Sequence, residues 1–108
     1  MQNKTDTYLG YCKTNEFIGL GSLVLNEEKI DEAELGYMLF PEHWGKGYGS
    51  EIAEILIRKA NRTAVKRLTA IIDPKNIPSR KILINNGFIS LKLCEIEGLP
   101  GEILSKEL

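Results

Sequence analysis

The sequence predicts a mixed α/β fold, an α+β sheet structure with the element order β-β-β-α-β-α-β-β. Before Pro41, three short apolar segments are separated by brief polar breaks, which is typical of an antiparallel meander. After Pro41, two segments with helical apolar spacing alternate with short apolar strands. Because a helix between two strands allows a crossover, we expect at least one parallel pair in the sheet.

The composition fits a single domain. The chain has 108 residues, with 14 Lys and Arg against 15 Asp and Glu, for a formal net charge of −1. Domains commonly have ~100–150 residues, so we expect residues 1–108 to form one unit. The near-neutral charge argues against nucleic acid as a partner, and no apolar run reaches the ~20 residues that cross a bilayer.

The cysteine count and the N-terminal sequence indicate a cytoplasmic protein. The first residues contain no apolar signal segment. Cys12 and Cys94 are too few for a disulfide scaffold. With only one histidine in the chain, they also make a metal site unexpected.

The three segments before Pro41 are predicted strands. Residues 8–13 and 17–25 are rich in aromatic and aliphatic side chains, and a polar break separates them. The glycines of the second segment, Gly19 and Gly21, suggest a bend or the close approach of another backbone. Residues 34–40 form the third predicted strand, which Pro41 ends.

A glycine-rich loop leads into the first predicted helix, at about residues 47–62. Ile52, Ile55, Leu56 and Ala60 follow the spacing of an amphipathic helix. Such a loop at a helix N-terminus is an anion site in principle, because backbone N–H groups there lack intrahelical acceptors. Its glycine spacing fits neither the phosphate loop of nucleotide-hydrolysing proteins nor the dinucleotide-binding fingerprint.

The second half of the chain contains a strand, a helix and two more strands. Residues 67–72 are a predicted strand that the crossover places parallel to the third. Pro78 suits the first turn of a second helix, and Gly87 is a natural left-handed cap at its end. Residues 88–94 alternate as a strand, and residues 102–104 can pair as the last one.

An ordered set of motifs runs along the chain: Glu34-x-Gly36-Tyr37, Trp44-x-x-Gly47-x-Gly49, Asn76-x-x-Ser79 and Gly87-Phe88. This set resembles the GNAT superfamily of acyl-CoA-dependent N-acetyltransferases. Within that superfamily it is most similar to the branch that acetylates the N-terminal alanine or serine of ribosomal proteins. The resemblance covers about residues 8–104. It implies a truncated GNAT-like fold that lacks the family's N-terminal strand and first two helices.

The resemblance implies acetyl-CoA as the acyl donor, an amine as the acceptor, and a set of residues that hold the donor. Backbone groups of the third strand would pair with the pantetheine arm like an added strand. Amides of the glycine-rich loop would hold the pyrophosphate. The implied cofactor-binding residues are Met38, Leu39, Phe40, Gly45, Lys46, Gly47, Tyr48, Gly49, Ser50, Asn76 and Ser79. A helix cap remains the alternative role for Asn76.

Two residues are candidates for catalysis. A free α-amine has a pKa near ~8 and a lysine amine near ~10.4, so an α-amine acceptor needs less help from a base. Glu34 is the candidate base, and a solvated carboxylate is its alternative. Ser79 is placed by the motif to donate a hydrogen bond to the leaving thiolate, and a helix-start serine is its alternative.

The remaining polar and aromatic residues are expected to play structural or solvated roles. We expect His43 to be solvated, and Trp44 and Tyr48 to pack within the loop. Arg80 and Lys81 are expected to be exposed helix charges, and contact with the 3′-phosphate of CoA is their alternative role. The two cysteines are expected to be small core residues.

Three functions stay open at this point. The leading hypothesis is an N-acetyltransferase that transfers the acetyl group directly from acetyl-CoA to an amine, possibly a protein N-terminus. The alternatives are a non-catalytic CoA-binding module or truncated remnant that acts through dimerisation, and a purely structural domain. Because the missing segment would leave apolar surface uncovered, we expect a homodimer.

Overall fold

The computed structural model describes residues 6–108 as six strands and two α-helices. The strands are β1 (Thr7–Lys13), β2 (Glu16–Leu25), β3 (Glu32–Leu39), β4 (Arg67–Ile72), β5 (Ile89–Ile96) and β6 (Leu99–Glu107). The helices are α1 (Tyr48–Asn61) and α2 (Ile77–Asn85), and a short 3-10 turn covers Pro41–His43. Residues 1–5, which the expectation about a signal segment concerns, lie outside the described part.

The strands form one sheet in the order β1-β2-β3-β4-β6-β5. The first three strands pair antiparallel and β4 pairs parallel to β3, so the predicted meander and crossover are confirmed. Several strand boundaries differ from the sequence prediction, and two of these differences are larger in their effect on the sheet. Phe40 falls outside β3, because the chain turns there toward Pro41, and β6 is longer than predicted because it pairs along its length with both β4 and β5.

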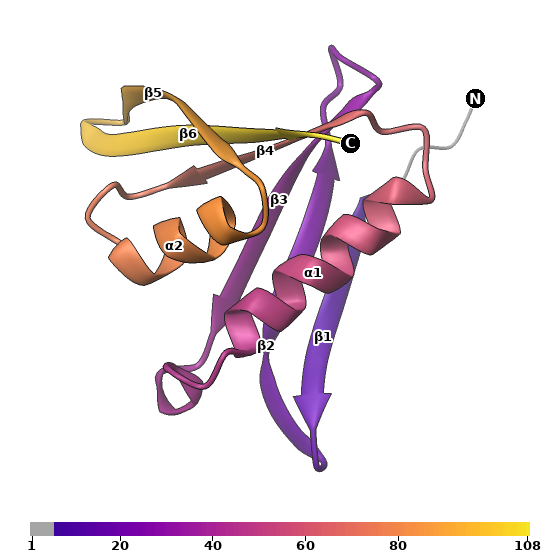
Figure 1. Ribbon diagram of the computed structural model, residues 1–108, viewed down its shortest axis with the longest axis vertical. Coiled ribbons are helices and arrows are strands. Elements are labelled where there is room, and N and C mark those ends of the chain that lie inside the picture. Colours follow the sequence, from indigo (N-terminus) through magenta and orange to yellow (C-terminus); the bar gives the residue numbers. More distant parts are fainter. Residues whose placement is uncertain (1–5) are drawn as a thin grey trace.

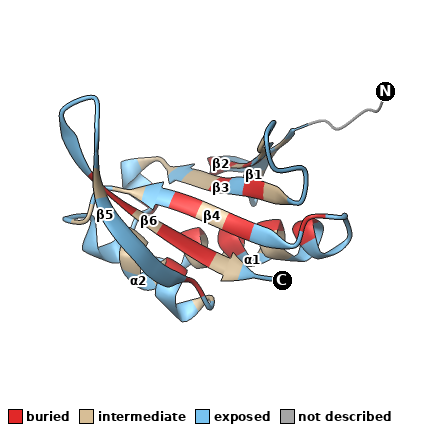
Figure 2. Cartoon of the chain, turned by 90° about the horizontal axis from the view of Figure 1, so that it is seen from above, coloured by how far each residue is buried: buried red, intermediate tan, exposed pale blue. Residues whose placement is uncertain are grey.

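Both helices lie on the same side of the sheet, and the core is between them and the strands (Figure 2). α1 presents the predicted apolar stripe, with Ile52, Leu56 and Ala60 buried, and Leu83 of α2 is fully buried. No helix within residues 6–108 covers the other side, which we call the open face. It exposes apolar side chains that include Leu20, Val24 and Ile71.

β3 and β4 pair over only part of their length. Their ladder joins Glu32 to Arg67, Ala33 to Leu68, and Glu34 to Thr69, whereas β3 remains paired with β2 as far as Leu39. Beyond Glu34 the two parallel strands diverge toward their carboxyl ends (Figure 1). This divergence opens the sheet beside the N-terminal end of α1 and α2.

The two cysteines were predicted as small core residues, and this prediction is wrong. Cys12 is exposed and Cys94 is half-buried, and both are free thiols. Both lie on strands at the edges of the sheet, β1 and β5, where only one neighbouring strand is present. Local apolar patterns do not reveal whether a strand is central or at an edge.

A charged pair joins α2 to β6, which corrects the expectation that Arg80 is simply an exposed helix charge. The Arg80 Nε atom donates to Glu102 Oε1 at 3.0 Å and to Oε2 at 3.2 Å, and Ser90 Oγ donates to Oε2 at 2.6 Å. Glu102 is buried, with 3% of its surface exposed. Hydrogen bonds from Arg80 and Ser90 lower the pKa of Glu102 below its usual value.

This pair predicts a specific loss of stability in acid. A carboxylate whose folded pKa is lowered stabilises the fold above its unfolded pKa of about 4.3, and that contribution is lost as the pH falls through the folded pKa. We expect Glu102→Gln to destabilise the protein at pH 7 by about 1–3 kcal/mol. The difference in melting temperature between Glu102→Gln and the wild type should become smaller below about pH 4. Glu54→Gln, which removes an exposed α1 ion pair, should show neither effect; a gap that stays constant from pH 7 to pH 3 would contradict the prediction.

Candidate functional site

A cavity of about 770 Å³ lies where β3 and β4 diverge, between α1 and α2. Most of the predicted cofactor-binding residues line it. They are Met38, Leu39, Gly45, Gly47, Tyr48, Gly49, Ser50, Asn76 and Ser79. The structure therefore brings together residues from β3, the glycine-rich loop, α1 and the start of α2.

Two of the predicted cofactor-binding residues do not line the cavity. Phe40 packs instead against Phe17 of β2, with ring centroids 5.5 Å apart. Lys46 is exposed on the glycine-rich loop.

The glycine-rich loop ends in a helix start with free backbone donors. Gly47 is the N-cap of α1, with φ of 83°, and Glu51 N–H makes the bond to Gly47 C=O that opens the helical ladder. The three N–H groups before it, on Tyr48, Gly49 and Ser50, therefore have no intrahelical acceptor. All three residues line the cavity, so an anion bound there would meet unpaired donors and the positive end of the helix dipole.

Gly49 sets the distance between the two helices. A Cβ atom at this position would lie 2.8 Å from Ile82 Cδ1 of α2 and 3.6 Å from Leu39 Cδ1 of β3. The absence of a side chain therefore lets the first turn of α1 approach both elements closely.

The backbone of β3 offers its own polar groups to the cavity. Phe40 N–H donates to Ile18 C=O at 3.2 Å, so the even-numbered residues of this strand direct their peptide groups toward β2. Since strand residues alternate, the peptide groups of Tyr37 and Leu39 face the opening that β4 has left. Trp44 Nε1 donates to the Leu39 carbonyl at 3.1 Å, which ties the loop to the end of β3.

The aromatic residues of the loop divide between packing and exposure. Tyr48 packs beside Tyr11 and His43, with ring centroids 6.1 Å and 6.2 Å away, as expected for a loop-packing residue. Trp44 holds the loop through its indole N–H, but 64% of its surface is exposed. It lines the cavity, so it also presents an aromatic face to whatever binds there.

His43 was predicted to be solvated, and this prediction is wrong, because only 4% of its surface is exposed. The 3-10 turn after β3 folds its ring inward against Tyr48. Its Nε2 atom lies 3.3 Å from Glu16 Oε2, without the geometry of a hydrogen bond. The one histidine of the chain therefore supports the base of the loop.

Asn76 begins α2, and its cap role is confirmed. Its side-chain carbonyl oxygen accepts a hydrogen bond from Ser79 N–H at 3.2 Å. The residue also lines the cavity, and the cap uses only the oxygen of the side-chain amide. Capping and ligand binding are thus compatible at this position.

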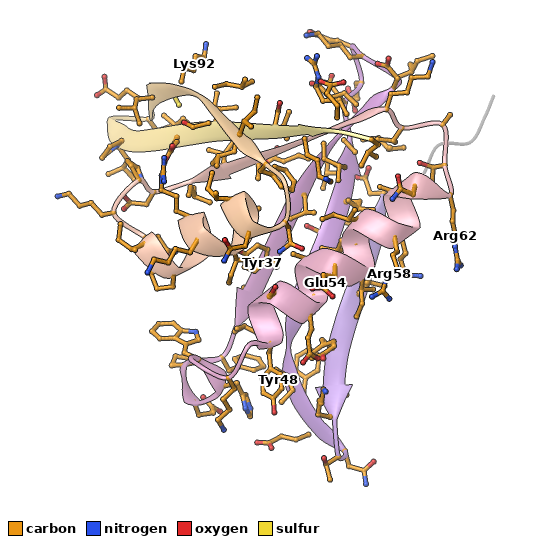
Figure 3. The ribbon with its side chains drawn as sticks, in the orientation of Figure 1. Tyr37, Tyr48, Glu54, Arg58, Arg62 and Lys92 are labelled. Carbon is orange, nitrogen blue, oxygen red and sulfur yellow. The ribbon has the colours of Figure 1, made fainter. Side chains whose placement is uncertain are left out.

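Ser79 lies in the first turn of α2 and meets Tyr37 of β3. Its Oγ atom is 2.8 Å from the Tyr37 hydroxyl, and its carbonyl oxygen accepts from that hydroxyl at 3.3 Å. Burial raises the pKa of Tyr37, and the hydrogen bond with Ser79 partly offsets this rise. Figure 3 shows Tyr37 between the two helices. Tyr37 belongs to the Glu34-x-Gly36-Tyr37 motif but is not among the predicted site residues.

Glu34 does not join this group. It is exposed on β3, and its neighbours Ala33 and Leu35 are buried under the helices, so its side chain lies on the open face. It is not one of the residues that line the cavity. Its role as a base stays a prediction. If Glu34 has that role, the base and Ser79 lie on opposite sides of the sheet.

Comparisons with known proteins show what this chain is similar to. A family model described as "Acetyltransferase (GNAT) domain" matches residues 1–89. N-acetyltransferase p20 of Bacillus licheniformis, described as uncharacterised, is 35% identical over 77 residues, which cover 70% of this chain. Those residues are 43% of the relative, so the chain matches less than half of its length.

Solved structures with low sequence identity share the fold. The yncA protein of Salmonella typhimurium, solved with its cofactor acetyl-CoA, is 21% identical, with a TM-score of 0.86 over 94% of this chain and 64% of that one. The ribosomal-protein-alanine N-acetyltransferase of Brucella melitensis is 22% identical, also with a TM-score of 0.86, over 94% of this chain and 68% of that one.

Within residues 6–108, no helix has the length and apolar character needed to cross a membrane. In the same part of the chain, no three His, Cys, Asp or Glu side chains are grouped so that they could hold a metal ion.

Proposed function

The chain belongs to the acetyltransferase (GNAT) family, and we propose from this premise that it binds acetyl-CoA and transfers the acetyl group to an amine. The observation that carries the proposal is the cavity at the divergence of β3 and β4. It combines the unpaired donors at the start of α1 with the free peptide groups of β3. These are the two kinds of group that a pyrophosphate and an amide-containing arm require.

The cavity suggests how acetyl-CoA would lie. The pyrophosphate would be held by the N–H groups of residues 48–50, and the pantetheine arm would pair with Tyr37 and Leu39 of β3. Asn76 would use its free amide nitrogen beside the same arm. The thioester would then lie near Ser79, where the C-terminal part of β3 meets the first turn of α2.

The proposed reaction is a direct transfer without a covalent enzyme intermediate. The amine nitrogen attacks the thioester carbonyl, a C–N bond forms, and the C–S bond breaks to release the thiolate of CoA. The amine would approach from the open face, where Glu34, the candidate base, would take the proton that the nitrogen loses, directly or through water. The thiolate, whose thiol has a pKa near ~8.5, needs only the weak hydrogen-bond support that Ser79 could give.

We propose a protein N-terminal α-amine as the acceptor. Its lower pKa leaves about a tenth of it neutral at pH 7, against less than a thousandth of a lysine amine. Glu34 is exposed and does not line the cavity, and this position suits an acceptor that needs little activation. The fold likeness to an enzyme that acts on a ribosomal protein is in keeping with this choice.

A direct assay tests the proposal. We expect free thiol to be released from acetyl-CoA when the protein meets a peptide with an N-terminal alanine or serine. The matched control is the same peptide with a blocked N-terminus and one lysine, which should react much more slowly at pH 7. No thiol release with any amine would contradict the proposed reaction, and no heat of acetyl-CoA binding would contradict the proposed ligand.

A second candidate function is a non-catalytic CoA-binding module that acts through dimerisation. It is favoured by the position of Glu34 outside the cavity. It predicts acetyl-CoA binding without turnover in the same assays. Measuring both binding and thiol release therefore separates the two candidates.

We also propose a homodimer in the cytoplasm. The apolar side chains of the open face, among them Leu20, Val24 and Ile71, would be covered by a second copy. The free thiols of Cys12 and Cys94 fit a reducing compartment. A monomeric mass by sedimentation at micromolar concentration would contradict the dimer.

A further inference from the structure

The hydroxyl groups of Tyr37 and Ser79 form a pair that links β3 to α2 inside the cavity. We propose that Tyr37 is a positioning residue: its hydroxyl, 2.8 Å from Ser79 Oγ, holds that oxygen in place and donates to it when the Ser79 proton hydrogen-bonds the sulfur of CoA. The inference deepens the proposed function and rests on it. It assigns a role to Tyr37, which lies on β3, 42 positions along the chain from Ser79 on α2.

The two hydroxyl groups can exchange the role of donor. The Tyr37 oxygen contacts two Ser79 atoms, the carbonyl oxygen at 3.3 Å and Oγ at 2.8 Å. The carbonyl can only accept, and in the contact between the two hydroxyl groups either atom could be the donor. A phenol is more acidic than an alcohol and is the better donor of the two. When the sulfur of CoA accepts the Ser79 proton, the Ser79 oxygen can therefore accept the Tyr37 proton in turn.

The backbone of Ser79 is held as well, which leaves its hydroxyl little freedom. Ser79 N–H donates to the Asn76 side chain at 3.2 Å, and the residue lies in the first turn of α2. Its carbonyl and Oγ are both engaged by Tyr37. Since Ser79 is a lining residue, the direction that remains for its proton includes the cavity.

The relative acidities favour a hydrogen-bonding role for Tyr37 over transfer of its proton to the thiolate. Burial raises the pKa of Tyr37 above its ordinary value of about 10, and the hydrogen bond with Ser79 offsets only part of this rise. A thiol has a pKa near ~8.5, so transfer of the phenolic proton to a thiolate would be unfavourable by more than tenfold. The pair therefore acts by hydrogen bonding, and chains of such bonds strengthen one another in a partly buried site.

Kinetics of Tyr37→Phe test this role. The variant keeps the ring and loses only the hydroxyl, so we expect kcat to fall about tenfold while KM for acetyl-CoA changes by less than about twofold. Ser79→Ala should lower kcat at least as much, and the double variant should be no slower than Ser79→Ala, because the two groups act as one unit. Ser79→Thr, which keeps a hydroxyl, should retain more activity than Ser79→Ala.

A matched control separates this effect from a general effect of removing a phenol. Tyr8→Phe makes the same change at an exposed residue of the edge strand β1, where 69% of the side-chain surface is accessible. It should leave kcat and KM unchanged. A Tyr37→Phe variant that behaves like Tyr8→Phe, or single effects that multiply in the double variant, would overturn the inference.

A binding experiment tests the pair without turnover. The probes are CoA and desulfo-CoA, which lacks the sulfur atom, compared by calorimetry at about pH 9, where most of the thiol is ionised. We expect the wild type to bind CoA about fivefold more tightly than desulfo-CoA, and both Tyr37→Phe and Ser79→Ala to lose most of this preference. An unchanged preference in Tyr37→Phe overturns the inference. Absence of thiol release with a normal preference contradicts only the proposed reaction.

Discussion

Gly47→Ala is expected to weaken acetyl-CoA binding at least tenfold, or about 1.4 kcal/mol, with the fold intact. Gly47 has φ of 83°, a left-handed conformation that costs residues with a Cβ atom ~1–2 kcal/mol. No protein atom lies within 4 Å of the added Cβ, so packing does not oppose the change. The cost falls on the backbone at the N-cap of α1, where the free N–H donors of the cavity begin. Calorimetric titration with acetyl-CoA measures the loss.

Gly98→Ala is the matched control for this prediction. Gly98 has φ of 84° and also has no protein atom within 4 Å of an added Cβ, but it lies in the turn between β5 and β6, away from the cavity. Both variants should lower the melting temperature by similar amounts, and only Gly47→Ala should lose affinity. Equal affinities in the two variants would show that the conformation of the loop does not matter for binding.

The local elements were predictable because their signals are local. The spacing of Ile52, Leu56 and Ala60 predicted a helix at residues 47–62, and α1 covers Tyr48–Asn61. The short connections predicted the meander, and the crossover predicted the parallel pairing of β4 with β3. The motif set also identified most residues that line the cavity, since the loop and both helix starts belong to it.

What was missed depends on contacts between distant parts of the chain. The burial of His43 needs Tyr48 and Glu16 beside it, and the role of Arg80 needs Glu102 on β6. Contacts with residues far away in the sequence produce no periodic pattern from which they could be predicted. The separation of Glu34 from the cavity has a different origin: strand side chains alternate between faces, so Glu34 and Tyr37, an odd number of positions apart, lie on opposite sides of β3.

Leu68→Ala is expected to be the most destabilising of these changes, by about 2–5 kcal/mol. Leu68 is fully buried on β4 and pairs with Ala33, which is 1% exposed, within the three-position ladder that joins β3 to β4. Domains of this size have a total stability of ~5–15 kcal/mol, so the loss is a large share of it. We expect the melting temperature to fall by roughly 10–30 °C. Ile71→Ala, on the same strand but 42% exposed on the open face, should cost less than about 1 kcal/mol.

The same variant tests whether the cavity depends on the core beneath it. Leu68 does not line the cavity, and the donors of α1 and β3 lie beyond the ladder that it supports. Acetyl-CoA at about 100 times its Kd should therefore stabilise the folded variant by about 2.7 kcal/mol, as it should the wild type. The rise in melting temperature caused by the ligand should thus survive the substitution, even though both temperatures are lower. A rise that disappears in Leu68→Ala but persists in Ile71→Ala would contradict this, and would mean that the divergence of β3 and β4 is itself set by packing at Leu68.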